Sequence, residues 1–320
     1  MRSGFQIAIG TLVYLCCSLA GTAPATSAVE ANSDDALAVI PLQRNAHNLY
    51  TLDVSVGRGV VFRGVADTDP LPFIFDTGAN KTAIPRLIAN QLIADGQISF
   101  DQTGHAVTGT FDTGLFIIDS LDFGLGPREI EVAVFEEHHD AVMSAAGILG
   151  SNAFQDEIIV LDHPAGELRL LARAALAGEM PLRMEDGLIV GEGQIRGVRD
   201  PVRIFVDTGA TASIVNRALV RRHQTARLGR FSEIRGVSGR VIIQGEQRHL
   251  FRGFQISDLC ACAFQITVSD VYFFDRMGSM DEPAILLGMD ILRHARIIID
   301  YGSGSARIEG ADRWRCPNTP

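Results

Sequence analysis

Two stretches of the chain repeat one pattern, with FIFDTGA at residues 73–79 and IFVDTGA at residues 204–210. In each, three apolar residues lead into Asp-Thr-Gly-Ala, which predicts a buried strand that ends in a glycine-containing loop. Glycine tolerates the backbone angles that let N–H groups approach a neighbouring carboxylate. Asp76 and Asp207 are therefore expected at equivalent places in two copies of one unit.

The repeat continues downstream of both aspartates. Residues 148–170, which begin Ile-Leu-Gly, align without a gap with residues 286–308, which begin Leu-Leu-Gly. In each segment an aspartate follows an apolar run, at Asp162 and Asp300, and we expect both to begin turns. Between the aspartate loop and this element the copies differ by seven residues, a change that loops absorb at little cost. An internal duplication therefore organises the chain.

Short apolar and β-branched runs separated by glycine-rich turns predict an all-β fold with two lobes. One short helix is expected in each copy, at 85–94 with Pro85 as its first residue and at 217–223 with Asn216 as its cap. Residues 173–186 lack a strand pattern and are the natural joint. The predicted divisions are a signal peptide at 1–28, an N-terminal segment at 29–44, lobes at 45–172 and 187–310, a linker at 173–186 and a tail at 311–320.

The N-terminus has the pattern of an export signal. Arg2 precedes an apolar stretch at 5–19, and small residues follow up to Ala28, where cleavage is expected. Cleavage after Ala25 also fits, and an uncleaved membrane anchor is the alternative. We expect a periplasmic or secreted protein without stable membrane insertion once the signal is cleaved.

Composition narrows the range of partners and cofactors. The net charge of −10 disfavours nucleic acid, because phosphate binding depends on clustered lysine and arginine. After signal cleavage three cysteines remain, Cys260, Cys262 and Cys316, which permit one disulfide and leave one thiol. Three thiols without a nearby histidine make a poor zinc site. No metal and no cofactor are expected.

Two carboxylates related by a local two-fold axis have a distinct chemistry. At close range like charges cannot both ionise, so the pair shares one proton and works as acid and base together. The ionised aspartate can take a proton from water while its protonated partner polarises a carbonyl group. This chemistry requires neither a metal nor a covalent intermediate.

The two Asp-Thr-Gly-Ala loops and the two later apolar-apolar-Gly elements resemble those of retropepsin-like aspartic peptidases over roughly residues 45–310. The resemblance implies a two-lobed acid protease fold with a cleft between the lobes. It implies an aspartic endopeptidase that acts as a monomer on a protein or peptide substrate. By the same resemblance, Asp76 and Asp207 are the catalytic residues, and their loops are supported by Thr77, Gly78, Thr208 and Gly209.

The chain departs from pepsin-like enzymes at Ala79 and Ala210, where those enzymes usually carry a hydroxyl residue. A hydroxyl that donates to a carboxylate favours ionisation, so its absence predicts higher pKa values and an optimum at weakly acidic or neutral pH. The sequence also has no clear counterpart of the tyrosine that pepsin-like enzymes carry in their flap. Glycine spacing predicts flaps at 104–113 and 236–245.

Other motifs have ordinary explanations. A third Asp-Thr-Gly, at 112–114, continues into Leu115 and has no counterpart in the second copy, which indicates a flap or turn. The sequence EEHHD at 136–140 suggests a metal-dependent hydrolase, but consecutive side chains seldom converge on one ion, so a solvated loop is favoured. Nine arginines between 217 and 252 predict a solvated basic face, or a contact for acidic substrates.

Two rival functions use the same fold. The chain could be a non-catalytic periplasmic or surface module that binds extended peptides in the cleft. Alternatively, two chains could form composite sites, although the unequal copies favour pairing within one chain.

Overall fold

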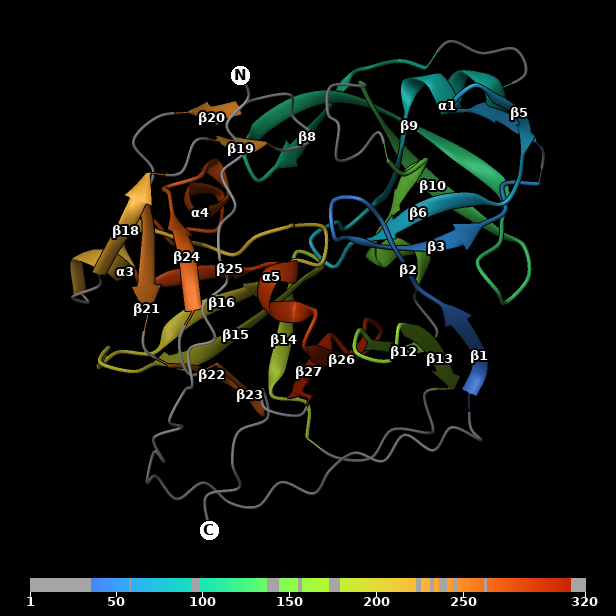
Figure 1. Ribbon diagram of the computed structural model, residues 1–320. Coiled ribbons are helices and arrows are strands. Elements are labelled where there is room, and N and C mark those ends of the chain that lie inside the picture. Colours follow the sequence, from blue (N-terminus) through green and yellow to red (C-terminus); the bar gives the residue numbers. More distant parts are fainter. Residues whose placement is uncertain are drawn as a thin grey trace, which may run out of the picture.

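The computed structural model describes residues 36–57, 59–93, 98–136, 144–154, 157–172, 179–222, 226–230, 233–235, 241–243, 247–251, 253–261 and 264–311. The expected signal peptide and all of the tail except Ala311 lie outside these residues. Figure 1 shows two strand-rich lobes, blue to green and yellow to orange, with further strands between them. The predicted all-β, two-lobed fold is confirmed. In the described part of the chain, no helix has the length and apolar character needed to span a membrane.

Eight strands form the sheet of the first lobe, in the order β2-β3-β6-β11-β7-β10-β9-β8. They are β2 (Gln43–Arg44), β3 (Tyr50–Val54), β6 (Leu71–Phe75), β11 (Gly147–Leu149), β7 (Thr82–Pro85), β10 (Arg128–Phe135), β9 (Gly109–Leu121) and β8 (Gln102–Ala106). A separate ribbon joins β4 (Val60–Phe62) to β5 (Val65–Thr68). The central strand β6 runs parallel to β11 and antiparallel to β3. Its near-continuous apolar sequence suits this buried position.

The second lobe repeats this arrangement along the order β15-β16-β25-β17-β24-β21-β18. The strands are β15 (Leu188–Ile195), β16 (Val202–Val206), β25 (Ala284–Leu287), β17 (Ile214–Val215), β24 (Phe264–Val268), β21 (Gln247–Phe251) and β18 (Ala226–Arg230). Two ribbons are added, β22 (Phe254–Ile256) with β23 (Leu259–Ala261), and β19 (Glu233–Arg235) with β20 (Val241–Ile243). Here β16 runs parallel to β25, as β6 does to β11.

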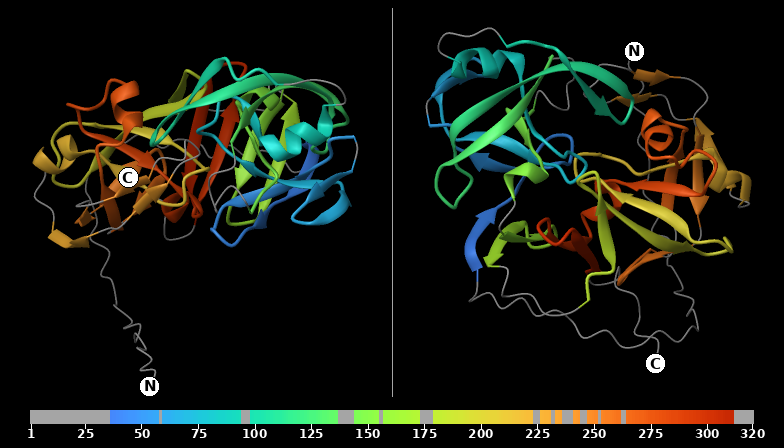
Figure 2. Two further views of the ribbon diagram at one scale, coloured as in Figure 1. Left: turned by 90° about the horizontal axis from the view of Figure 1, so that it is seen from above. Right: turned by 180° about the vertical axis from the view of Figure 1, so that it is seen from behind.

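Six strands connect the lobes in the order β1-β13-β12-β26-β27-β14 (Figure 2). They are β1 (Ala36–Pro41), β13 (Glu167–Ala172), β12 (Glu157–Asp162), β26 (Ala295–Asp300), β27 (Ser305–Gly310) and β14 (Leu182–Glu185). Val160 of β12 lies opposite Ile298 of β26, and these two residues occupy equivalent positions in the sequence repeat. A local two-fold axis therefore passes through this pair of strands. One core cluster includes buried residues from both lobes, so the lobes fold around shared apolar packing.

The predicted linker at 173–186 is wrong for residues 182–185, which form β14. Leu182 is buried and Met184 is half-buried, whereas Arg183 between them is exposed, and this alternation suits a strand with one solvated face. β14 pairs with β27 as β1 pairs with β13 in the first copy, but β14 lies between β27 and β15, whereas β1 lies at the edge of the sheet. The N-terminal segment at 29–44 is likewise part of the fold from Ala36 onward.

Both predicted helices are present. Helix α1 (Arg86–Leu92) begins after Pro85, which is its cap rather than its first residue, and α3 (Arg217–Arg222) begins after Asn216. The Asn216 carboxamide oxygen accepts a hydrogen bond of 3.0 Å from the Leu219 N–H, so the predicted cap is confirmed. The second lobe adds α4 (Tyr272–Arg276) and α5 (Met289–Leu292), and a 3₁₀ turn, η2 (Ser151–Ala153), matches α5 in the first copy.

The first predicted flap is a hairpin of β8 and the start of β9, connected at Val107 and Thr108. The third Asp-Thr-Gly lies inside β9 of this hairpin, so its interpretation as a turn is wrong, while its interpretation as part of a flap stays a prediction. Of the second predicted flap, at 236–245, the structure describes β20 at 241–243, while 236–240 and 244–245 lie outside the described residues. Asp162 and Asp300 both accept backbone N–H bonds at the end of a strand, which confirms that they begin turns.

Candidate active site

The two Asp-Thr-Gly-Ala loops leave equivalent strands of the two lobes. Asp76 follows β6, and its N–H donates to the Leu149 carbonyl of the neighbouring β11 at 3.1 Å. Asp207 follows β16, and its N–H donates to the Leu287 carbonyl of β25 at 3.0 Å. The parallel neighbour therefore holds each aspartate where its strand ends. Because these strands lie in the core, both aspartates start from rigid supports.

Reciprocal hydrogen bonds join the two loops across the lobes. The Thr77 N–H donates to the Thr208 hydroxyl at 3.0 Å, and the Thr208 N–H donates to the Thr77 hydroxyl at 3.1 Å. Each hydroxyl in turn donates to the opposite strand, Thr77 to the Val206 carbonyl at 2.9 Å and Thr208 to the Phe75 carbonyl at 2.7 Å. Both threonines are almost fully buried. Four buried bonds thus fix one aspartate loop against the other.

The loop glycines bring the carboxylates together. The Gly78 N–H donates to Asp76 Oδ1 at 2.7 Å, and the Gly209 N–H donates to Asp207 Oδ1 at 2.9 Å. A Cβ placed on Gly78 would lie 2.7 Å from the Asp207 carboxyl carbon, and one on Gly209 would lie 2.4 Å from that of Asp76. Each glycine therefore faces the carboxyl group of the other lobe, and no larger residue fits there.

A second pair of polar contacts supports the loops from behind, and sequence reasoning missed it. In the first lobe, Asn152 Oδ1 accepts from the Thr82 N–H at 2.6 Å and from its hydroxyl at 2.9 Å. In the second lobe, Asp290 Oδ1 accepts from the Ser213 N–H at 2.9 Å and from its hydroxyl at 2.6 Å. The hydroxyl residue lies six positions after each loop aspartate, and its acceptor lies two positions after each Leu-Gly. That repeated spacing was the available signal.

Burial and mutual repulsion set the electrostatics of the pair. Loss of hydration raises the pKa of Asp207 well above its ordinary value, and the nearby Asp76 charge raises it further. Burial also raises the pKa of Asp76, against the lowering effect of backbone donors such as the Gly78 N–H. Since the pKa of each carboxyl group is raised and the two groups interact, the arrangement favours one proton shared between Asp76 and Asp207.

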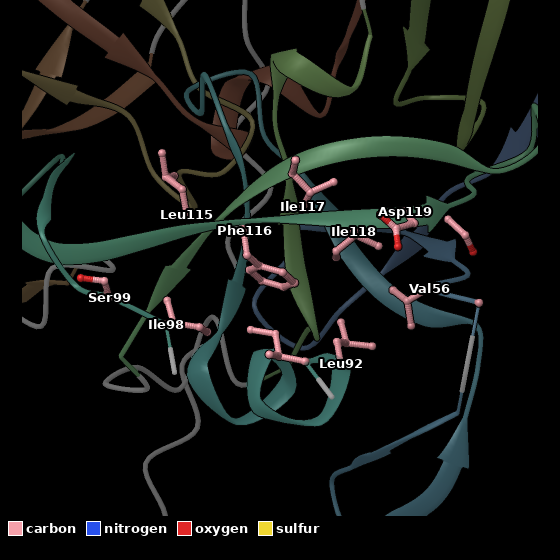
Figure 3. A pocket seen from close by; sticks show the side chains of 12 residues that line it. Val56, Leu92, Ile98, Ser99, Leu115, Phe116, Ile117, Ile118 and Asp119 are labelled. Carbon is pink, nitrogen blue, oxygen red and sulfur yellow. The ribbon is translucent and has the colours of Figure 1, made fainter. Parts of the chain in front are cut away.

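One cavity of about 590 Å³ does not include the aspartate pair in its lining. It lies in the first lobe between β9 and the end of α1, where Phe116, Ile118, Leu92 and Val56 point toward one another (Figure 3). Ser99, Asp119 and Ser120 supply its polar lining. None of its lining residues belongs to an aspartate loop, so we do not assign the chemistry to it.

The rival motifs do not form a second site within the described residues. Glu136 forms an ion pair with Arg86 at 2.6 Å, and the rest of the cluster at 136–140 lies outside the described residues. No group of three or more potential metal ligands occurs among the residues that the structure describes. Cys260 is disulfide-bonded, with a partner outside the described residues.

The predicted basic face is only partly described. Arg217 pairs with Asp270 at 3.1 Å and Arg222 with Asp200 at 3.3 Å, so two of its nine arginines have acidic partners. These exposed pairs contribute little to stability. They also reduce the net positive charge of this face.

Comparison with known protein families gives one match in each lobe. A family model described as "Aspartyl protease" matches residues 60–153, and one described as "gag-polyprotein putative aspartyl protease" matches residues 191–294. Each match includes one Asp-Thr-Gly-Ala loop and the Leu-Gly element that packs behind it. No curated protein matches the chain at a significant level.

Proposed function

This chain belongs to the retropepsin-like aspartic peptidases, with both lobes in one polypeptide, and on that premise we propose that it is an endopeptidase whose catalytic residues are Asp76 and Asp207. Thr77, Gly78, Thr208 and Gly209 support the two catalytic loops. The reciprocal hydrogen bonds between Thr77 and Thr208 carry this proposal, because they hold the two carboxyl groups face to face.

Hydrolysis in this proposal uses one water molecule and one shared proton. Asp76, ionised, takes a proton from the water as its oxygen bonds to the carbonyl carbon of the scissile peptide. Asp207, protonated, donates to the carbonyl oxygen and stabilises the charge that develops there. When the tetrahedral intermediate breaks, the C–N bond cleaves, the leaving amine takes up the proton held by Asp76, and Asp207 takes back a proton from one hydroxyl of the intermediate. A free carboxyl group and a free amine result.

The working pH follows from the raised pKa of both aspartates. The pair is active only while it holds one proton, so raised pKa values move the active range upward from strongly acidic pH. Ala79 and Ala210 supply no side-chain donor to the carboxylates, and the lack of such a donor also raises the pKa of the aspartates. We expect the optimum at weakly acidic or neutral pH.

The proposed setting is an exported monomer that acts on protein or peptide substrates. One chain supplies both aspartate loops, so a second copy is not required for the site. The disulfide at Cys260 suits an oxidising compartment such as the periplasm or the cell exterior. An uncleaved N-terminal anchor would tether the same enzyme to a membrane.

The test compares three single substitutions of the same type. The purified chain is incubated with a mixed peptide library from acidic to neutral pH, and products are identified by mass spectrometry. Asp76→Asn and Asp207→Asn should each abolish cleavage, whereas Asp112→Asn, in the third Asp-Thr-Gly, should retain it. Cleavage that survives either of the first two substitutions would refute the shared site. A folded wild-type chain that binds peptides without cleaving them would indicate a peptide-binding module instead.

A further inference from the structure

The hairpin of β8 and β9 is buried at its tip, although it extends away from its own lobe. Gln102, Thr103 and His105 along its first strand are exposed. Thr108, at the turn, is only 5% exposed. A hairpin tip is ordinarily the most solvated part of such an element. Its burial shows that another part of the molecule covers it.

Helix α4 of the second lobe contacts this tip. The Phe273 N–H at the start of α4 donates to the Val107 carbonyl of the turn at 3.1 Å. Beside it, His105 Nδ1 and the Tyr272 hydroxyl are 2.8 Å apart, within hydrogen-bond distance. The two rings stack with an interplanar angle of 7° and centroids 6.1 Å apart. Among the residues that the structure describes, one backbone bond and one side-chain pair connect the hairpin tip to α4.

Helix α4 is a firm platform for this contact. Arg203 Nη1 donates to the Met277 carbonyl at 2.8 Å and to the Ser279 hydroxyl at 3.0 Å, just after the helix. Asn216 Nδ2 donates to the Ser279 carbonyl at 2.6 Å. Phe274 within the helix is fully buried. These contacts hold α4 in place within its own lobe.

The docked tip lies beside the second aspartate loop. Val107 packs against a cluster of buried apolar residues that includes Phe205 of β16 and Phe273 of α4. Ala210, three residues after Asp207, packs against the same cluster. The hairpin thus crosses from one lobe to the other next to the proposed catalytic pair.

We propose that His105 and Tyr272 are positioning residues that latch this hairpin across the cleft, closing it over the aspartate pair. The inference deepens the proposed peptidase function and rests on it. A closed hairpin would hold the substrate against the pair and exclude water other than the attacking molecule. In this latch the first lobe supplies the hairpin and the second lobe supplies the helix that receives it, so the two lobes have different roles in closing the cleft.

The decisive variant is Tyr272→Phe, which keeps the stacked ring and removes only the hydroxyl. One partly exposed hydrogen bond shifts an equilibrium by about fivefold. We expect the Phe273 amide, whose bond to Val107 spans the lobes, to exchange hydrogen about fivefold faster. We expect kcat to fall by a similar factor while KM changes by less than about twofold, because the closed complex is needed for chemistry. Addition of His105→Asn to this variant should have little further effect, since both changes break one contact.

Tyr50→Phe is the matched control, since it removes a hydroxyl that donates to the His163 carbonyl at 3.1 Å in another part of the molecule. It should leave both readouts unchanged. Unchanged exchange at Phe273 in Tyr272→Phe would refute the latch, whether or not the chain cleaves peptides. Faster exchange with unchanged kcat, or with a lower KM, would show that the latch does not position the hairpin for catalysis. Failure of the peptidase proposal would appear instead as absent turnover in the wild-type chain.

Discussion

Replacement of Thr208 by valine tests whether the reciprocal threonine contact holds the two lobes together. The change keeps the shape of the side chain and removes its hydroxyl, which donates to the Phe75 carbonyl and accepts from the Thr77 N–H. Both partners are buried, with Phe75 at 2% and Thr77 at 0% exposure. Each buried group left without a partner costs about 1–3 kcal/mol, so we expect a loss of about 4 kcal/mol in unfolding free energy.

In Thr208→Val, kcat/KM should fall by more than the loss of unfolding free energy alone would suggest. The lost bonds join the two aspartate loops, and a shift of about 1 Å between reacting groups costs about 100-fold in rate. Urea unfolding measures the first effect, and kcat/KM on a cleaved peptide measures the second. Thr208→Ser, which restores the hydroxyl, should recover most of both.

The third Asp-Thr-Gly offers a matched control. The Thr113 hydroxyl donates to the Val134 carbonyl at 2.8 Å and is also buried, but among the described residues its hydrogen bonds stay within the first lobe. Thr113→Val should therefore cost about 1 kcal/mol and leave kcat/KM unchanged. If Thr208→Val were no more damaging than Thr113→Val, the threonine contact would not be what aligns the aspartates.

Three further predictions concern single side chains. Gly209→Ala would place a Cβ 2.4 Å from the Asp76 carboxyl carbon, so kcat/KM should fall by about 100-fold while circular dichroism still shows a folded chain. Asp290→Asn should change the unfolding free energy by less than about 1 kcal/mol, because the Asn152 carboxamide oxygen accepts the equivalent hydrogen bonds in the first lobe. Asp290→Leu removes the acceptor and should cost about 3 kcal/mol. Burial lowers the pKa of His163 from 6.5 to about 4, so its contribution to stability is complete above pH 6.5 and is lost as the pH falls toward 4, because the unfolded chain then binds a proton that the folded chain does not. Wild-type protein should lose about 3 kcal/mol over this interval relative to His163→Phe in urea titrations, and equal pH dependence of the two would contradict the assignment.

Some features of the fold were readable because their signals are local. The two aspartate loops, the Leu-Gly elements and the Asn216 cap each depend on a few consecutive residues, so a repeated pattern was enough to predict them. Strand β14 was missed because four residues with one alternation carry little signal. Its identity depends on β15 and β27, between which it lies in the sheet.

In the candidate site, too, some residues have a local sequence signal and others are brought together only by contacts between distant segments. Asp76 and Asp207 were predictable because duplication repeats both the aspartate and its context. The contact of His105 with Tyr272 was not, because the two residues lie 167 positions apart in copies that differ there. No periodicity connects a hairpin of one lobe with a helix of the other.

The amino-acid pattern alone is enough to predict two equivalent carboxylates on glycine-containing loops in an all-β duplicated unit. How the two copies face each other depends on the fold, in which threonine hydrogen bonds span 131 residues and a glycine of each loop lies against the carboxylate of the other. The docking of one hairpin on the opposite lobe also depends on the fold. The physical reason is that hydrogen-bond and packing preferences within a few residues are written in local sequence, whereas contacts between distant segments depend on how whole sheets pack.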